Sequence, residues 1–279
     1  MVASFSFRRH GAAVLVPALM LAACSAEPEP TPAEKAVAAR VPGAPAYAPN
    51  EVPLDGVAAS NVREANDLID FAYSYPREAA AIPKLAAWLD ADRAAKRDAL
   101  VAAAQRDQTA AARDDFPYHA HVHRQRWQRV TDTRRFLSLS SEIETYMGGA
   151  HGMTGFDTML WDRNRAALRK PIDLFTSAAA FDAAVRDRFC DGIARAKAAK
   201  GIRPATGDDG PFARCPPASA QTVWLGSSDG RSIDRMTIAI APYEIGPFAE
   251  GSYTINLPVT RAVVEALKPD FARDFLPIN

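Results

Sequence analysis

Three alternating histidines form the clearest pattern that could do metal chemistry. His119, His121 and His123 occupy every second position of a segment that reads as a β-strand, so their imidazoles would share one face of a sheet. Zinc accepts two or three imidazole ligands, and Glu142 or Glu144 of a later strand could complete the site across a hairpin. The alternative is a solvated face of weak histidine–glutamate pairs, which would lose strength as rising pH removes the histidine charge. We favour the solvated face and predict no metal or other cofactor.

Two glycine-bracketed loops supply the candidate ligand-binding residues. The run Gly148–Gly152 predicts a tight turn, and its histidine could act as a general base or hydrogen-bond to nearby backbone. The second loop, 242–251, could pack on the core or present its aromatic side chains to a partner. The candidate residues are Gly148, Gly149, His151, Tyr243 and Phe248. Because the strand serines Ser138, Ser140 and Ser141 do not lie in a Gly-x-Ser-x-Gly nucleophile elbow, we predict no catalytic residue.

The N-terminal segment predicts export from the cytoplasm. Arg8 and Arg9 precede an apolar run over 11–23, which is too short to span a bilayer and is typical of a signal peptide. The tetrapeptide Leu21–Cys24 resembles the lipobox of bacterial lipoproteins, and this implies cleavage before Cys24 and its acylation. An ordinary cleaved signal with a chance cysteine is the alternative. Ser25 is not the aspartate that retains lipoproteins at an inner membrane, which favours the outer membrane of a Gram-negative cell.

The two remaining cysteines, Cys190 and Cys215, predict a disulfide. Disulfides persist in oxidising compartments such as the one that the export signal implies. Two free buried thiols or a redox pair are the alternatives, but no Cys-x-x-Cys spacing supports redox chemistry. We therefore expect a structural disulfide.

The charge balance gives no sign of a nucleic-acid partner. The chain has 33 basic and 33 acidic side chains. Removing the predicted signal would take away Arg8 and Arg9 and no acid, so the mature chain would carry a net charge near −2. A protein that binds nucleic acid typically has a basic patch or stripe.

The pattern of apolar residues predicts an α+β fold. Residues 1–23 form the predicted signal peptide and residues 24–56 a proline- and alanine-rich tether. Two sequential halves follow, 57–165 and 166–279, which we expect to form one compact unit with an antiparallel or mixed sheet packed against helices. Expected strands are 68–75, 118–127, 136–147, 154–161, 222–225, 235–241 and 253–257, and expected helices are 82–113, 178–198 and 260–267.

The strands 118–127 and 136–147 are expected to pair as an antiparallel hairpin with one buried side. The apolar faces coincide if Val122 lies opposite Ile143. This register would place the histidine face against the glutamate face and leave both in solvent.

Two motifs in this order resemble a known bacterial family. They are Leu137–Asp157, which contains the glycine-rich turn, and Ala241–Gly251. Together they resemble the paired domains of unknown function in the ectodomain of a lysozyme-sensing anti-sigma factor and in the non-catalytic part of a peptidoglycan deacetylase. The resemblance covers roughly residues 60–268 and implies a sandwich-like domain in the cell envelope that binds lysozyme or cell-wall glycan. It supplies no catalytic residues.

The chain departs from both relatives. No transmembrane helix or sigma-binding segment is expected after the signal, which disfavours an anti-sigma role, and no deacetylase metal motif is present. We therefore expect a lipid-anchored binding module on the periplasmic face of the envelope, with the bilayer and either peptidoglycan or lysozyme as partners. The alternatives are an envelope hydrolase or metalloenzyme that uses the histidine face, or a structural protein without a small ligand.

Overall fold

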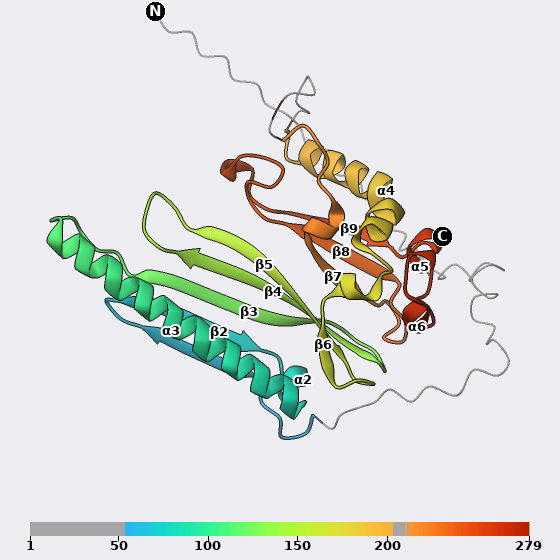
Figure 1. The fold of residues 1–279 in the computed structure, drawn as a ribbon, viewed down its shortest axis with the longest axis horizontal. Coiled ribbons are helices and arrows are strands. Elements are labelled where there is room, and N and C mark those ends of the chain that lie inside the picture. The colour runs from blue at the N-terminus through green and yellow to red at the C-terminus, as the bar shows by residue number, and fades with distance from the viewer. Residues whose placement is uncertain (1–53, 203–209, 211, 279) are drawn as a thin grey trace, which may run out of the picture. The chain divides into compact units, whose positions relative to one another are not determined.

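The protein is described by a computed structural model that covers residues 54–202, 210 and 212–278. The signal peptide, Cys24 and the tether up to residue 53 lie outside the described residues. The fold is α+β, as predicted (Figure 1). Within the described ranges, no helix is both long and apolar enough to cross a membrane.

The first sheet has six strands that lie in chain order. All neighbours are antiparallel except β2 and β3, which are parallel. This mixed sheet agrees with the predicted fold class, although the short and largely exposed first strand was not predicted. The strands are β1 (Ser60–Ala65), β2 (Ile69–Tyr75), β3 (His121–Asp132), β4 (Phe136–Tyr146), β5 (Met153–Asp162) and β6 (Ala167–Arg169).

One long helix makes the parallel connection between β2 and β3. After the short α2 (Arg77–Ala80), α3 (Pro83–Arg113) begins with a proline, which suits a first helical turn because no backbone N–H is needed there. It lies along β2 and β3 (Figure 1). Its buried leucines, including Leu85 and Leu89, pack with Phe71 of β2 and Trp127 of β3. This apolar contact fixes α3 on one face of the sheet.

The C-terminal residues form a second, three-stranded antiparallel sheet. It consists of β7 (Thr222–Gly226), β8 (Arg235–Ile240) and β9 (Tyr253–Pro258). The helix α4 (Ala178–Ala199) packs on β9, where Gly192 meets Ile255 so closely that a Cβ atom would overlap its side chain. A 3₁₀ helix (Pro171–Leu174) precedes α4, and the short helices α5 (Arg261–Glu265) and α6 (Pro269–Ala272) follow β9.

The second sheet packs on the face of the first sheet that α3 leaves free. Along β4, Phe136 belongs to the core of the second sheet and Leu137 to the core under α3. Successive strand residues point to opposite faces, so the two layers lie on opposite sides. Thr158 of β5 donates a hydrogen bond to the carbonyl oxygen of Val223 at 2.7 Å, and Trp224 Nε1 donates to that of Asp157 at 2.9 Å. These bonds join the two sheets directly.

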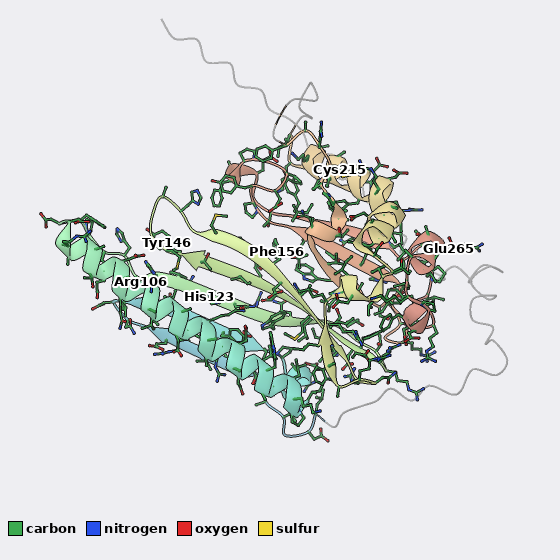
Figure 2. All side chains as sticks on the ribbon, viewed as in Figure 1. Arg106, His123, Tyr146, Phe156, Cys215 and Glu265 are labelled. Carbon is green, nitrogen blue, oxygen red and sulfur yellow. A yellow bond between two sulfur atoms is a disulfide. The ribbon has the colours of Figure 1, made fainter. Side chains whose placement is uncertain are left out.

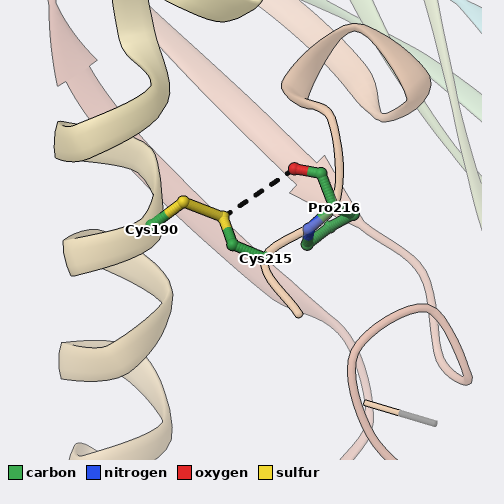
Figure 3. Close-up of a disulfide and its surroundings, with 3 residues drawn as sticks. All are labelled: Cys190, Cys215 and Pro216. Atoms are coloured by element: carbon green, nitrogen blue, oxygen red, sulfur yellow. Dashed lines mark hydrogen bonds between the residues drawn. A yellow bond between two sulfur atoms is a disulfide. The ribbon is translucent and has the colours of Figure 1, made fainter. Parts of the chain in front are cut away.

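The predicted disulfide is present. Cys190 of α4 and Cys215 are joined with a Cα–Cα distance of 5.6 Å, and the bond closes a loop across 25 positions of sequence (Figure 3). It ties the segment before β7 to the middle of α4.

The predicted register of the β3–β4 hairpin is wrong by three residues. Val122 pairs with Tyr146, and Gln125 is the residue opposite Ile143. An odd shift exchanges the two faces, so the histidine face is turned toward α3 and the glutamate face toward solvent. The physical reason is Trp127, which shares the histidine face and is only 3% exposed. Burial of the large Trp127 side chain gains more free energy than burial of the small Val122 side chain would.

Candidate functional site

The turn between β4 and β5 organises the candidate site. Gly148 and Gly149 have φ angles of +90° and +89°, a conformation that favours glycine. A Cβ atom at either position would meet nothing within 4 Å, so the backbone conformation, not space, requires glycine here. The hydroxyl of Tyr146 donates to the carbonyl oxygen of Gly149 at 3.1 Å and holds the turn.

The structure brings the histidine of this turn onto the aromatic side chains of the second loop. The rings of His151 and Phe248 stack with centroids 3.8 Å apart and an interplanar angle of 14°. The Tyr243 hydroxyl lies 3.3 Å from His151 Nε2, and its ring centroid lies 5.7 Å from that of Phe248. His151 Nδ1 is 2.9 Å from the carbonyl oxygen of Gly152. We call His151, Tyr243 and Phe248 the aromatic cluster.

Tyr243 is held in an unfavourable backbone conformation and remains accessible. Its φ angle is +72°, and the residue is 48% exposed. Such a conformation costs free energy in a residue other than glycine and persists only where the surroundings impose it. A strained, exposed aromatic residue in a loop is typical of a binding surface.

Lys197 of α4 and Lys200, which caps the C-terminus of this helix, hold the second loop in place. Lys197 donates to the carbonyl oxygen of Ile245 and pairs with Glu250 at 3.5 Å. Lys200 donates to the carbonyl oxygens of Glu250 at 2.5 Å and Ser252 at 2.9 Å. The loop therefore has a fixed shape that the helix imposes.

Glu250 fills the inside of this loop. Its Oε2 accepts a hydrogen bond from the Tyr253 hydroxyl at 2.5 Å, and a Cβ atom at Gly246 would overlap its carboxylate. Burial, followed by this hydrogen bond, raises the pKa of Tyr253 above its ordinary value. Gly246 and Glu250 are thus needed together for the conformation that presents the aromatic cluster.

The glycine turn also borders a second feature, on the side of α3. A cavity of about 270 Å³ lies between the C-terminal part of α3, the segment 116–121 and the turn. His119 and His121 line it together with Gly148 and Gly149. The sequence-predicted residues therefore divide between this cavity and the aromatic cluster, with the turn common to both.

The three alternating histidines have three different environments. His119 precedes β3 and is exposed, whereas His121 is 2% exposed, with Nε2 3.2 Å from Asp107 Oδ2. Figure 2 shows His123 on β3, beside α3, and its ring stacks on Phe71 at 5.8 Å. Within the described ranges, no three histidine, cysteine or acidic side chains are placed to hold a metal ion.

The predicted histidine–glutamate pairs do not form. Glu144 lies on the opposite face of the sheet and pairs with Arg124 at 3.3 Å. Burial, followed by the nearby charge of Lys96, lowers the pKa of His123. Since the neutral imidazole is favoured, the contribution of His123 to stability grows as pH rises, which is opposite to the predicted direction.

A buried polar network under α3 was missed at the sequence level. Trp127 Nε1 donates to the Tyr73 hydroxyl at 2.8 Å, and this hydroxyl donates to Asp92 at 2.8 Å. Lys96 pairs with Asp92 at 2.8 Å and donates to Gln125 at 2.7 Å. The four-residue spacing of Asp92 and Lys96 on one helix was the available signal.

Comparison with known proteins places this architecture among bacterial domains of unknown function. The fold is similar to the crystal structure of a DUF3298 family member from Bacteroides fragilis, with a TM-score of 0.51 and 15% identity over 77% of this chain and 95% of that one. A DUF3298 family protein from Pseudomonas aeruginosa is also similar, with a TM-score of 0.47 and 14% identity over 81% of this chain and 100% of that one.

A family model gives the more particular match. Residues 62–154, which begin in β1 and end in β5, match the family described as deacetylase PdaC. The resemblance to bacterial domains of unknown function is confirmed by both comparisons. No curated protein matches the chain.

Proposed function

We propose that the chain is a lipid-anchored envelope protein that binds cell-wall glycan on the aromatic cluster. The observation that carries the proposal is the stacking of His151 on Phe248 beside the half-exposed Tyr243. Two loops that are distant in sequence build this surface. Both lie in the sequence motifs that resemble the bacterial envelope family. A binding surface is favoured over a purely structural contact because Tyr243 is strained and still accessible.

The chemistry of the aromatic cluster suits a sugar chain. A pyranose ring presents a face of C–H groups that packs on an aromatic ring, whose face carries negative charge. The hydroxyl of Tyr243 and the exposed carboxylate of Glu244 lie at the same loop and could bond to sugar hydroxyls. The match to a family described as a deacetylase and the resemblance to the non-catalytic part of a peptidoglycan deacetylase support the same ligand class.

The lipid anchor rests on the sequence of Leu21–Cys24. Acylation there would leave a tether of 24–56 between the membrane and the folded part, which suits a module that reaches the wall. Labelling of growing cells with a fatty-acid analogue should mark the wild-type protein but not Cys24→Ser. Equal labelling of the two would remove the anchor from the proposal.

Retention on insoluble peptidoglycan sacculi tests the binding function. The purified protein should sediment with sacculi, and Tyr243→Ala and Phe248→Ala should each reduce the retained fraction severalfold. Trp88→Ala is the matched control, since Trp88 is a 41% exposed aromatic residue on α3. Retention on immobilised lysozyme but not on sacculi would show a protein ligand instead, and equal retention of all variants would reject the aromatic cluster as the site.

A further inference from the structure

The cavity beside the glycine turn has the composition of a second ligand site. It uses residues of α3 and of the segment before β3, none of which belongs to the aromatic cluster. Its volume of about 270 Å³ suits a small organic group. The inference drawn from it goes beyond glycan binding and does not depend on it.

The walls of the cavity are aromatic and apolar. Phe116 and Met147 line it and are 53% and 48% exposed. Large apolar side chains that gather at one exposed place mark an interaction site, and a methionine adapts its shape to what it contacts. Tyr118 forms another wall, and its hydroxyl is fixed by donating to the carbonyl oxygen of Leu68 at 2.7 Å. The cavity wall thus combines a tyrosine whose hydroxyl is fixed with two more exposed apolar side chains, Phe116 and Met147.

A carboxylate supplies the charge of the cavity. Asp107 lines it, its side chain is 57% exposed, and its Oδ2 lies 3.2 Å from His121 Nε2. Among the ion pairs of the described ranges, Asp107 is joined to this histidine and to no lysine or arginine. This carboxylate shares the cavity lining with Phe116 and Tyr118, and both a carboxylate and an aromatic face attract a cation.

We propose that this cavity binds an organic ammonium ion, with the positive group between Asp107 and the aromatic walls. A neutral apolar ligand would gain nothing from the carboxylate, and an anion would be repelled by it. Gly148 and Gly149 of the turn also line the cavity, where they contribute backbone and no side chain. The geometry thus points to a quaternary or primary alkylammonium.

Calorimetric titration of the purified protein with choline tests this assignment. The neutral isostere 3,3-dimethylbutan-1-ol and the anion 3,3-dimethylbutanoate serve as ligand controls, because they keep the same branched carbon skeleton. Choline should bind at least tenfold more tightly than either. Asp107→Asn should weaken choline binding tenfold or more, Asp107→Glu should retain part of it, and Phe116→Ala should weaken it severalfold.

Asp98→Asn is the matched control, because Asp98 is a 76% exposed carboxylate on the same helix and pairs with Arg97. Its affinity for choline should equal that of the wild type, and thermal unfolding should show that all variants are folded. Equal affinity for choline and its neutral isostere, unchanged binding in Asp107→Asn, or no saturable binding would each overturn the assignment. Asp107→Asn should still sediment with sacculi and Tyr243→Ala should still bind choline, so the two proposals can fail separately.

Discussion

The two ends of the β3–β4 hairpin have opposite characters. At the end where β3 turns into β4, Arg135 is 6% exposed and Asp162 is fully buried. At the other end, the turn after β4 is bordered by Phe116, Met147 and Tyr243, each about half exposed. One sheet thus has a closed end of paired charges and an open end of uncovered apolar groups.

The closed end holds the two halves of the fold together. Arg135 lies 3.4 Å from Asp162, and its Nη1 donates to Asp274 at 2.7 Å. Its guanidinium also lies over the rings of Phe136 and Phe271, at 5.0 Å and 4.6 Å from their centroids. Charged groups buried in this way must all be paired, because removal of one partner leaves the other uncompensated.

At the open end the two halves meet through the aromatic cluster instead of through buried ion pairs, and the difference separates stability from recognition. Exposed apolar side chains have little burial energy to lose, so substitution there changes what the surface can bind more than whether the chain folds. We therefore expect the closed end to govern the free energy of unfolding and the open end to govern ligand retention.

The largest expected effect is that of Asp162→Ala at the closed end. It removes the acceptor of both Arg135 and Arg169, which lie at 3.4 Å and 3.1 Å, and should lower the free energy of unfolding by about 3–5 kcal/mol. Denaturant unfolding measures this loss. Asp270→Ala is the control, because this 69% exposed carboxylate pairs with an exposed arginine and should change stability by less than about 0.5 kcal/mol. A loss below about 1 kcal/mol in Asp162→Ala would contradict the view that the closed end governs stability.

The disulfide offers the next largest effect and sharpens the comparison. Cys190→Ser combined with Cys215→Ser opens a loop spanning 25 positions and should lower the free energy of unfolding by about 3 kcal/mol in the chain-entropy model. Choline binding at the cavity should be unchanged in the folded variant, because the disulfide lies in the C-terminal half and no cavity residue belongs to that half. Loss of that binding would show that the open end depends on the C-terminal half.

A smaller effect is expected in the glycine turn. Gly149→Ala places a side chain where φ is +89° and should cost roughly 1–2 kcal/mol. Gly155→Ala is the control, because this glycine of β5 has no positive φ and a Cβ atom there would also meet nothing within 4 Å. Equal stability of the two variants would show that the turn tolerates other backbone conformations and is not preorganised.

The elements were predictable where local signals were strong. Pro83 and the spacing of Leu85 and Leu89 indicated a helix over 82–113, and the structure has it at Pro83–Arg113. The repeated apolar spacing from Phe181 to Ile193 likewise indicated α4, which the structure places at Ala178–Ala199. In α3 a periodic apolar stripe and a start signal agree, and in α4 the apolar stripe indicates the helix by itself. Such patterns are what local sequence can show.

Pairing across the fold was not predictable in the same way. Val122 and the histidines alternate cleanly, but the sequence alone does not show that Trp127 decides which face is buried. The contact between His151 and Tyr243 joins residues separated by 92 positions. Both loops were recognised as candidates, yet their meeting depends on how the two sheets pack, which no local pattern encodes.

The smallest expected effect concerns His123 and the polar network under α3. Because burial and Lys96 lower its pKa in the folded state, the unfolded chain takes up a proton near pH 6.5 that the folded chain does not. The contribution of His123 should therefore be fully present above about pH 6.5 and be lost progressively as pH falls below that value. Denaturant unfolding at pH 7.5 and pH 5.0 measures this loss. The free energy of unfolding should differ less between the two pH values in His123→Leu than in the wild type. Trp88→Ala, at an exposed position of α3 without a titratable group, should keep the wild-type difference. If the free energy of unfolding depends on pH in His123→Leu as it does in the wild type, the space between α3 and the sheet admits the charged imidazole. The region between the closed end and the open end would then be less tightly packed than the structure indicates.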